Sequence, residues 1–208
     1  MLILIMNILK KDKVLNELHN KIFMELGPIK ELPQSPPEKY FNDLCSSIIG
    51  QQLSNTVADV IELRIKKFIG ADKLIMPENI ITANKDGLRT AGISFSKINY
   101  LNNLAELWIN GTIKHDLFKD LSDEAIINEL VKVKGVGKWT AEMFLMFSLG
   151  RKDIFSSGDL ILRKKTIQIY NLSEKIKPLE LEKFALRWSP KRTFVSRMLW
   201  ASTRLVKT

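Results

Sequence analysis

The chain has 208 residues, 45% of them hydrophobic and 26% charged, which is ordinary for a folded, soluble protein able to bury a core. Its 32 lysines and arginines against 23 aspartates and glutamates give a net charge of +9, and such an excess attracts polyanions such as nucleic acid. The single cysteine, Cys45, and the two histidines exclude a disulfide framework, a zinc finger, a four-cysteine iron–sulfur site and a histidine metal centre.

The N-terminal part contains an apolar opening, one predicted helix and a linker. The opening MLILIMNIL is too short for a membrane span, and its positive charges follow it, unlike those of a signal peptide. We therefore expect an intracellular protein that does not bind a membrane. A helix is predicted over 12–26, ending at Gly27-Pro28, and the prolines within 31–37 indicate a linker.

The middle of the chain is predicted to be helical. A long helical region covers 38–69 with an interruption at 50–54. Cys45 lies at helical spacing from Phe41 and Ile48, which predicts a buried structural thiol. The apolar stripe of a further helix is formed by Ile98, Leu101, Leu104, Ala105 and Trp108.

Further helices are predicted in the C-terminal half. Ser122 can cap a helix over 123–133, and the segment 139–149 is apolar nearly all round, as in a buried central helix. Ser189-Pro190 favours the start of the last helix. The inner stripe of that helix comprises Phe194, Val195, Met198, Leu199, Ser202, Leu205 and Val206. Because no segment alternates like a strand for long enough to build a sheet, the predicted fold is all-α.

Two glycines lie one residue apart in the segment VKGVGKWTA, residues 133–141, between two predicted helices. Glycine is a poor helix former, so 123–149 is predicted to be a helix–hairpin–helix motif. The hairpin amides and the positive end of the second helix could bind a phosphate, with Lys134 and Lys138 beside it. The alternative is a tight turn that only joins two packed helices.

Trp139 and Asp159 each have a functional and a structural interpretation. Trp139 could stack on a base extruded from a duplex, or it could be a core residue. Asp159 stands at the apparent start of a helix, where it could be an N-cap. Its carboxylate could also stabilise the positive charge on a sugar whose N-glycosidic bond is breaking, and could orient the attacking water. One residue can do both.

The positive charge is concentrated in the C-terminal half. The segment 131–170 holds eight basic residues and three acidic ones, and 186–208 holds six basic residues and no acid. This distribution favours contact with a polyanion there.

Three stretches together resemble the helix–hairpin–helix DNA glycosylases, namely SIIGQQLS at 47–54, the hairpin at 133–141 and GDLILR at 158–163. The chain is most similar to the 3-methyladenine DNA glycosylase II group, because GISFSK at 92–97 and WSPKR at 188–192 also match that group's pattern. The resemblance covers about 40–206. It implies a two-lobed helical fold without an N-terminal sheet domain, one lobe being 1–44 with 165–208 and the other 45–164.

The resemblance also implies roles for individual residues. Asp159 is expected to be the catalytic aspartate, and Trp139, Trp200 and Met143 are expected to line the base pocket. Gln52 falls where a side chain wedges into the duplex to fill the gap left by the flipped nucleotide. The residues expected to grip DNA phosphate are Lys134, Gly135, Val136, Gly137 and Lys138.

The resemblance implies no required cofactor and no catalytic metal, although the backbone of Val133 and Gly135 could hold a structural Na⁺ or K⁺. Bifunctional relatives carry a Schiff-base lysine where this chain has Trp139, and Lys138 points about 100° away round a helix. We therefore expect no β-lyase activity. The missing cysteine cluster separates the chain from the endonuclease III and adenine-mismatch branches.

The expected function is that of a monofunctional DNA glycosylase of base excision repair, which flips out purines such as 3-methyladenine or 7-methylguanine and hydrolyses the N-glycosidic bond to leave an abasic site. Alkylation at N3 or N7 makes a purine cationic, and each contact with an electron-rich ring such as Trp139 or Trp200 attracts it by roughly 0.5–2 kcal/mol. The expected partner is double-stranded damaged DNA bound by a monomer, in the cytoplasm or nucleoid of a prokaryote or the nucleus of a eukaryote.

Two alternatives stay open from the sequence. A glycosylase of the same fold could act on uracil, hypoxanthine or oxidised guanine. A non-catalytic helix–hairpin–helix module could only grip DNA, but it would have no use for Asp159, Trp139 and Trp200 together.

Overall fold

The computed structural model describes residues 2–31, 33–71 and 73–206, and every regular element within these ranges is helical. The all-α prediction is therefore confirmed for the described residues. They form two compact units: a terminal unit, Met1–Pro33 with Gly150–Thr208, and a central unit, Gln34–Leu149. None of the described helices combines the length and the apolar composition needed to cross a lipid bilayer.

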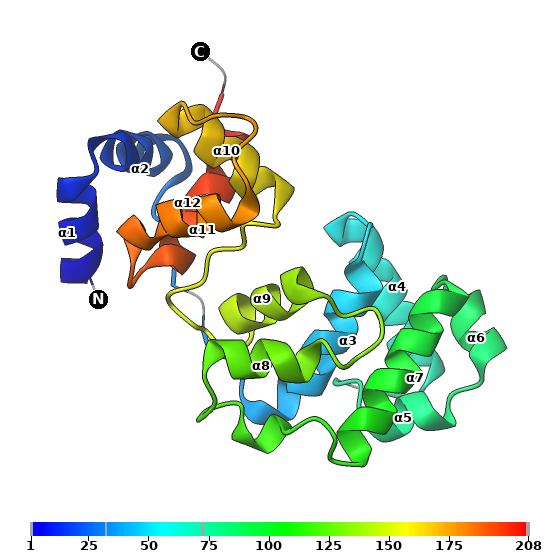
Figure 1. Cartoon of the computed structure of the whole chain (residues 1–208). Helices are drawn as coiled ribbons and strands as arrows, with labels where there is room; N and C mark the ends of the chain where they lie inside the picture. Colours follow the sequence, from blue (N-terminus) through cyan, green and yellow to red (C-terminus); the bar gives the residue numbers. More distant parts are fainter. Residues whose placement is uncertain (1, 32, 72, 207–208) are drawn as a thin grey trace. The chain divides into compact units, whose positions relative to one another are not determined.

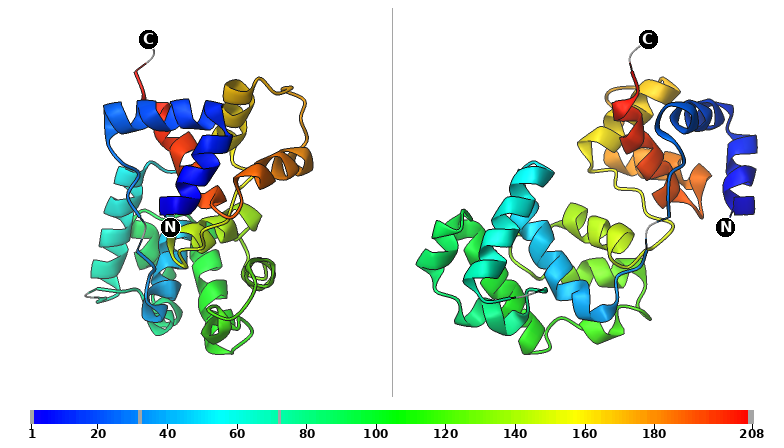
Figure 2. Two further views of the ribbon diagram at one scale, coloured as in Figure 1. Left: turned by 90° about the vertical axis from the view of Figure 1, so that its left-hand side faces the viewer. Right: turned by 180° about the vertical axis from the view of Figure 1, so that it is seen from behind.

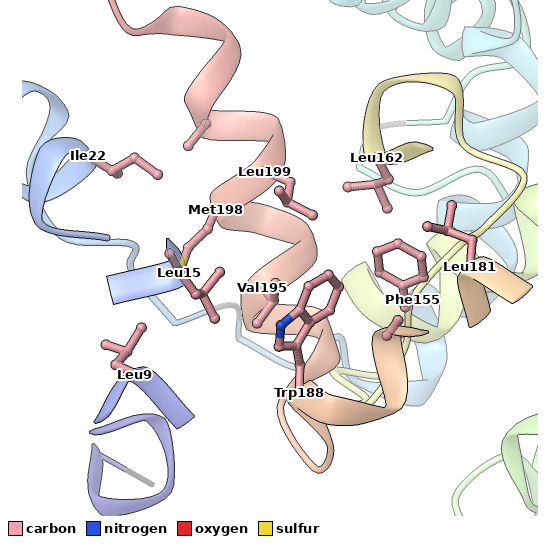
Figure 3. Packing of buried hydrophobic residues seen from close by; sticks show 12 residues of the cluster. Leu9, Leu15, Ile22, Phe155, Leu162, Leu181, Trp188, Val195, Met198 and Leu199 are labelled. Atoms are coloured by element: carbon pink, nitrogen blue, oxygen red, sulfur yellow. The ribbon is translucent and has the colours of Figure 1, made fainter. Parts of the chain in front are cut away.

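The terminal unit is built around its last α-helix. Its elements are α1 (Leu2–Lys11), α2 (Lys13–Leu26), α10 (Leu160–Tyr170), α11 (Pro178–Ala185), α12 (Arg192–Ala201) and the 3-10 helices η3 (Leu186–Trp188) and η4 (Ser202–Arg204). Helix α12 packs against both α2 and α10 (Figure 1). The core surrounds the fully buried Trp188, whose indole lies close to Phe155, and α12 contributes Val195, Met198 and Leu199 (Figure 3).

The central unit is built around α3. Its elements are η1 (Pro37–Lys39), α3 (Tyr40–Gly50), α4 (Asn55–Phe68), α5 (Pro77–Thr82), α6 (Lys85–Thr90), α7 (Phe95–Ile109), η2 (His115–Leu117), α8 (Asp123–Leu130) and α9 (Lys138–Phe147). Helix α3 lies between α4 and α9 (Figure 2, right) and also packs against α7. The rings of Tyr40, Phe118 and Phe144 form an aromatic centre in its core, with centroids 5.6–6.2 Å apart.

The unit boundaries differ from those of the expected lobes. They lie at 33/34 and 149/150 instead of 44/45 and 164/165. The difference follows from packing: α3 contacts α4, α7 and α9, whereas α10 contacts α12.

Several predicted helix limits are confirmed. Asp12 is the N-cap of α2, because its side chain accepts a hydrogen bond from the N–H of Leu15. Ser122 caps α8 in the same way, and the predicted interruption at 50–54 separates α3 from α4. Cys45 is fully buried as predicted, and burial raises the pKa of its thiol well above the ordinary value.

The start of the last helix was predicted wrongly. Helix α12 begins at Arg192, and the hydroxyl of Ser189 donates a hydrogen bond to the carboxylate of Asp153 instead of capping the helix. Val206 lies outside the inner stripe, since it is 73% exposed. The apolar opening, to which the sequence pattern assigned no helix, is α1, and its Leu9 is buried in the terminal unit.

Candidate active site and nucleic-acid interface

The two glycines of the hairpin between α8 and α9 have different structural requirements. Gly135 has a φ of +81°, and a Cβ placed on it would lie 2.2 Å from the ring of Tyr100. Both the conformation and the close approach therefore require glycine at 135. Gly137 has a φ of −93°, and nothing lies within 4 Å of a Cβ placed on it. The fold alone thus explains Gly135 but leaves Gly137 unexplained.

The hairpin turns its apolar side chains inward and its basic ones outward. Val133 and Val136 are buried, whereas Lys134 and Lys138 are exposed. The N–H of Val136 donates to the carbonyl of Val133 across 3.0 Å, so this amide is used inside the turn. Gly137 is the N-cap of α9 and has no side chain that could accept the N–H groups of the first turn. The exposed side is therefore a helix N-terminus flanked by two lysines, an arrangement suited to a phosphate.

The two backbone carbonyls expected to hold a monovalent cation both accept hydrogen bonds. Val133 accepts from Val136, and Gly135 accepts from the side-chain amide of Gln51 across 2.8 Å. A carbonyl oxygen has two lone pairs, so a cation could still bind there. The Na⁺ or K⁺ site stays a prediction. Among the described residues, no group of three or more His, Cys, Asp or Glu side chains could hold a metal ion.

The predicted wedge residue lies in the turn between α3 and α4. Gln52 is exposed and has a φ of +59°, a left-handed conformation that is uncommon for a residue other than glycine. Such a conformation persists when the surrounding structure holds it, and it is often found at functional sites. The carbonyl of the preceding Gln51 accepts a hydrogen bond from Nζ of Lys97 across 2.6 Å. The wedge turn is therefore anchored directly before Gln52.

A pocket of about 670 Å³ lies beside this turn, between α3, α4 and α9. Gln52, Trp139 and Met143 are all part of its lining, so the structure brings three of the predicted site residues together in the central unit. Trp139 is 45% exposed, which decides against the interpretation of this indole as a core residue. Part of this indole therefore lies at the surface of the pocket.

Asp159 and Trp200 are brought together in the terminal unit. Asp159 is the N-cap of α10: its Oδ1 accepts a hydrogen bond from the N–H of Leu162 across 2.8 Å. The same oxygen accepts from Nε1 of Trp200 across 3.1 Å. The residue is 9% exposed, so the carboxylate is largely buried. The capping interpretation of Asp159 is confirmed, and a chemical role is compatible with it because the carboxylate is held in one orientation.

The first turn of α12 fixes the segment that leads to Asp159. The guanidinium of Arg192 forms two hydrogen bonds with the Asp153 carboxylate, of 2.9 and 3.0 Å. The hydroxyl of Thr193 donates to the carbonyl of Arg151 across 2.7 Å and accepts from the N–H of Ile154 across 3.0 Å. Arg192 of the WSPKR stretch and the adjacent Thr193 thus hold the backbone at 151–154, which precedes Asp159 in the chain.

The contribution of α7 to the site was missed from the sequence. Lys97 belongs to the GISFSK stretch, which is part of the resemblance to the glycosylases. Its place in that stretch could have marked Lys97 as a candidate site residue. Asn103 has no comparable signal, yet its Oδ1 accepts a hydrogen bond from the N–H of Lys134 in the hairpin across 2.8 Å. Gln51 lies within the SIIGQQLS stretch, which gave no sign of a role for it, although its side chain donates a hydrogen bond to the carbonyl of Gly135.

The model of the HhH-GPD superfamily, described as base excision DNA repair proteins, matches residues 45–191 of this chain. The chain belongs to the HhH-GPD superfamily. The match includes the wedge turn, the hairpin and Asp159, so all three predicted parts of this HhH-GPD protein fall within the family region.

Individual relatives agree with this assignment. DNA-3-methyladenine glycosylase 1 of Schizosaccharomyces pombe is 31% identical over 186 residues, which cover 89% of this chain and 80% of the relative. A crystal structure of a DNA-3-methyladenine glycosidase from Bacillus halodurans is similar with a TM-score of 0.79 and 32% identity, covering 95% of this chain and 87% of that one. The S. pombe 3-methyladenine DNA glycosylase in complex with abasic DNA has a TM-score of 0.78 at 27% identity, covering 94% of this chain and 98% of that one.

Proposed function

We propose that this HhH-GPD protein is a DNA glycosylase that removes alkylated purines from double-stranded DNA and leaves an abasic site. The observation that carries the proposal is the hydrogen bond from Trp200 to the buried carboxylate of Asp159. An N-cap needs only the backbone N–H of Leu162, so the second donor on the same oxygen holds the carboxylate beyond what capping requires, which supports a chemical role for it. The names of the relatives support alkylated purines as the substrate class.

In the proposed reaction, the bond between C1′ of the sugar and the purine nitrogen breaks, and its electron pair leaves with the base. An alkylated purine is cationic and departs as a neutral base, so little acid catalysis is needed. The carboxylate of Asp159 stabilises the positive charge that develops at the sugar. The oxygen of a water molecule bonds to C1′, and Asp159 orients this water and accepts its proton. The exposed indole of Trp139 offers an electron-rich face to the cationic base.

The hairpin and the wedge turn have separate tasks in the proposal. Lys134, Gly137 and Lys138 hold the DNA backbone without reading its sequence. Gln52 occupies the space that the extruded nucleotide leaves in the duplex, which offsets part of the cost of unstacking.

We further infer that the protein has no lyase activity. Nζ of Lys138 lies 3.7 Å from Oε1 of Glu142, so this amine pairs with a carboxylate of its own helix. The position expected for a Schiff-base lysine is occupied by Trp139.

The test is base release from DNA treated with a methylating agent, with the freed bases identified by chromatography. Release of 3-methyladenine or 7-methylguanine supports the proposal. Duplexes containing uracil, hypoxanthine or 8-oxoguanine run in parallel test the alternative substrates. DNA binding without release of any base would identify a non-catalytic module. A covalent complex trapped by borohydride and lost in Lys138→Ala would show a lyase.

A further inference from the structure

One side of α7 contacts both the wedge turn and the hairpin. Helices α3 and α7 pack side by side (Figure 1). At the start of α7, Nζ of Lys97 donates to the carbonyl oxygens of Ile49 and Gln51 across 2.8 and 2.6 Å. Two turns later, Oδ1 of Asn103 accepts from the N–H of Lys134. Between them, the ring of Tyr100 lies against Gly135 and leaves no space for a Cβ there.

Lys97, Tyr100 and Asn103 are spaced three residues apart, so each is a neighbour of the next on the helix surface. The same helix contributes Ile98, Leu101, Leu104 and Ala105 to the core, and all four are fully buried. Helix α7 is therefore anchored in the core of the central unit while Lys97, Tyr100 and Asn103 contact the two loops. A helix anchored in this way is a rigid support for loops.

A direct bridge joins the same two loops. Nε2 of Gln51 donates to the carbonyl of Gly135 across 2.8 Å, linking residues that are 84 positions apart in the chain. The backbone carbonyl of Gln51 is the one that Lys97 holds. Gln51 is thus fixed at both its backbone and its side chain, immediately before the strained Gln52.

We propose that Lys97, Tyr100, Asn103 and Gln51 are positioning residues that hold the wedge turn and the phosphate-binding hairpin at one fixed separation. The inference rests on the proposed function, since it requires that Gln52 enters the duplex while the hairpin grips the backbone. A fixed separation pre-organises the surface, so that less conformational freedom is lost when DNA binds. The wedge then enters at a set distance from the gripped phosphate.

A purely structural interpretation makes a different prediction. If Lys97 only satisfies the last carbonyls of α3, its loss should lower stability and reduce binding of every duplex alike. If it positions the wedge, its loss should reduce the preference for a duplex with a missing base, and this effect should depend on the presence of Gln52. A preference ratio also cancels the general loss of affinity that follows from removing a positive charge.

The experiment compares four variants with the unaltered protein: Lys97→Met, Lys97→Arg, Gln51→Glu and Asn103→Ala. Gln51→Glu keeps the shape of the side chain but replaces the donor with an acceptor facing the carbonyl of Gly135. The matched control is Asn102→Ala, because among the described residues the Asn102 side chain bonds only to the carbonyl of Ile98 within α7. Fluorescence anisotropy measures binding to a duplex with a tetrahydrofuran abasic analogue and to the same duplex undamaged. Each variant is also combined with Gln52→Ala.

We expect Lys97→Met, Gln51→Glu and Asn103→Ala each to lower the preference for the abasic duplex about tenfold, the size expected for the loss of a single hydrogen bond. Lys97→Arg should restore most of the preference, since arginine can also donate to two carbonyls. Asn102→Ala should change nothing. In the Gln52→Ala background the three losses should largely disappear.

Two results would overturn the inference in distinguishable ways. If the unaltered protein shows no preference for the abasic duplex and Gln52→Ala does not change its binding, Gln52 is not a wedge. The proposed function is then wrong about the role of Gln52. If the preference exists and depends on Gln52, but the variants lose as much with Gln52→Ala as without it, the residues are only structural. Should Lys97→Met fail to fold, Gln51→Glu and Asn103→Ala decide between the same outcomes.

Discussion

The indole nitrogen of Trp200 and the N–H of Leu162 donate to the same carboxylate oxygen of Asp159, across 3.1 and 2.8 Å. The bond from Leu162 caps α10, whereas the bond from Trp200 comes from α12, 41 residues further along the chain. A cap and an oriented carboxylate are thus combined in one residue. Because the two bonds have different donors, substitutions can separate the stability of the helix from the chemistry of the carboxylate.

Asp159→Asn should abolish most base release while the protein stays folded. Asparagine caps a helix about as well as aspartate, so stability should change by no more than about 0.5 kcal/mol. The neutral amide cannot stabilise the charge on the sugar, and the rate should fall on the order of 100-fold or more. Single-turnover base release and thermal unfolding measure the two effects. Unchanged activity per folded molecule would reduce Asp159 to a cap.

Trp200→Phe should lower the rate of base release by about tenfold, since phenylalanine keeps a ring but removes the donor to Asp159. Affinity for undamaged duplex should stay the same. Trp108→Phe in the central unit is a suitable control, because Trp108 packs against Phe41 and His115 and lines no part of the candidate site. Equal losses in the two variants would mean that the hydrogen bond to Asp159 has no special effect.

Gly137→Ser should raise stability and weaken DNA binding at the same time. The hydroxyl of a serine N-cap accepts a hydrogen bond from an N–H group at the start of α9, which should stabilise the helix by about 0.3 kcal/mol. The same hydroxyl competes with the phosphate, so damaged and undamaged duplexes should both lose affinity. Binding titrations at several salt concentrations check this. If affinity and salt dependence are unchanged, the hairpin is only a turn.

Gly135→Ala should instead unfold part of the population at moderate temperature. The left-handed backbone alone costs roughly 1–2 kcal/mol for a residue with a Cβ, and the contact with Tyr100 adds to it. Urea unfolding measures the loss. A stability equal to that of the unaltered protein would show that the hairpin can rearrange away from Tyr100.

Gln52→Gly should separate strain from function in the wedge turn. Glycine adopts a φ of +59° without steric cost, so stability should rise by about 0.5–1 kcal/mol. Binding to a lesion duplex should weaken more than binding to a single strand, because only the duplex has a gap to fill. Gln52→Ala keeps the strain and removes the wedge, and it should show the binding loss without the gain in stability. Equal losses on duplex and single strand would argue against a wedge.

Asp153→Asn should destabilise the protein in a pH-dependent way. Burial alone would raise the pKa of Asp153, but the hydrogen bonds from Arg192 and Ser189 outweigh it and hold this pKa below the ordinary value of 3.8. A depressed folded pKa means that the carboxylate stabilises the fold above pH 3.8 and that this contribution is lost as the pH falls through the lower folded pKa. The variant should therefore lose about 1–2 kcal/mol near pH 7, and the difference should shrink in strong acid. A difference that is the same at pH 7 and pH 3 would contradict the pairing.

The sequence alone determined the features that depend on near neighbours in the chain. The helical period of apolar residues identified an all-α protein, and Asp12 and Ser122 marked helix starts through bonds that span three residues. The glycine pair located the hairpin for the same reason, since the cost of glycine in a helix is local. Motif order was sufficient to indicate the family, and the match over 45–191 confirmed it.

The tertiary structure decided what depends on packing between distant segments. The sequence could not show whether Trp139 is buried or exposed, because this depends on which helices cover α9. Local chemistry in the sequence predicted Ser189 as a helix cap. In the structure its hydroxyl instead donates a hydrogen bond to the carboxylate of Asp153, 36 residues earlier. Lys97 and Gln51 reach partners 48 and 84 residues away. Such contacts form only when α3, α7 and the hairpin pack together. The spacing of residues within one segment therefore cannot predict them.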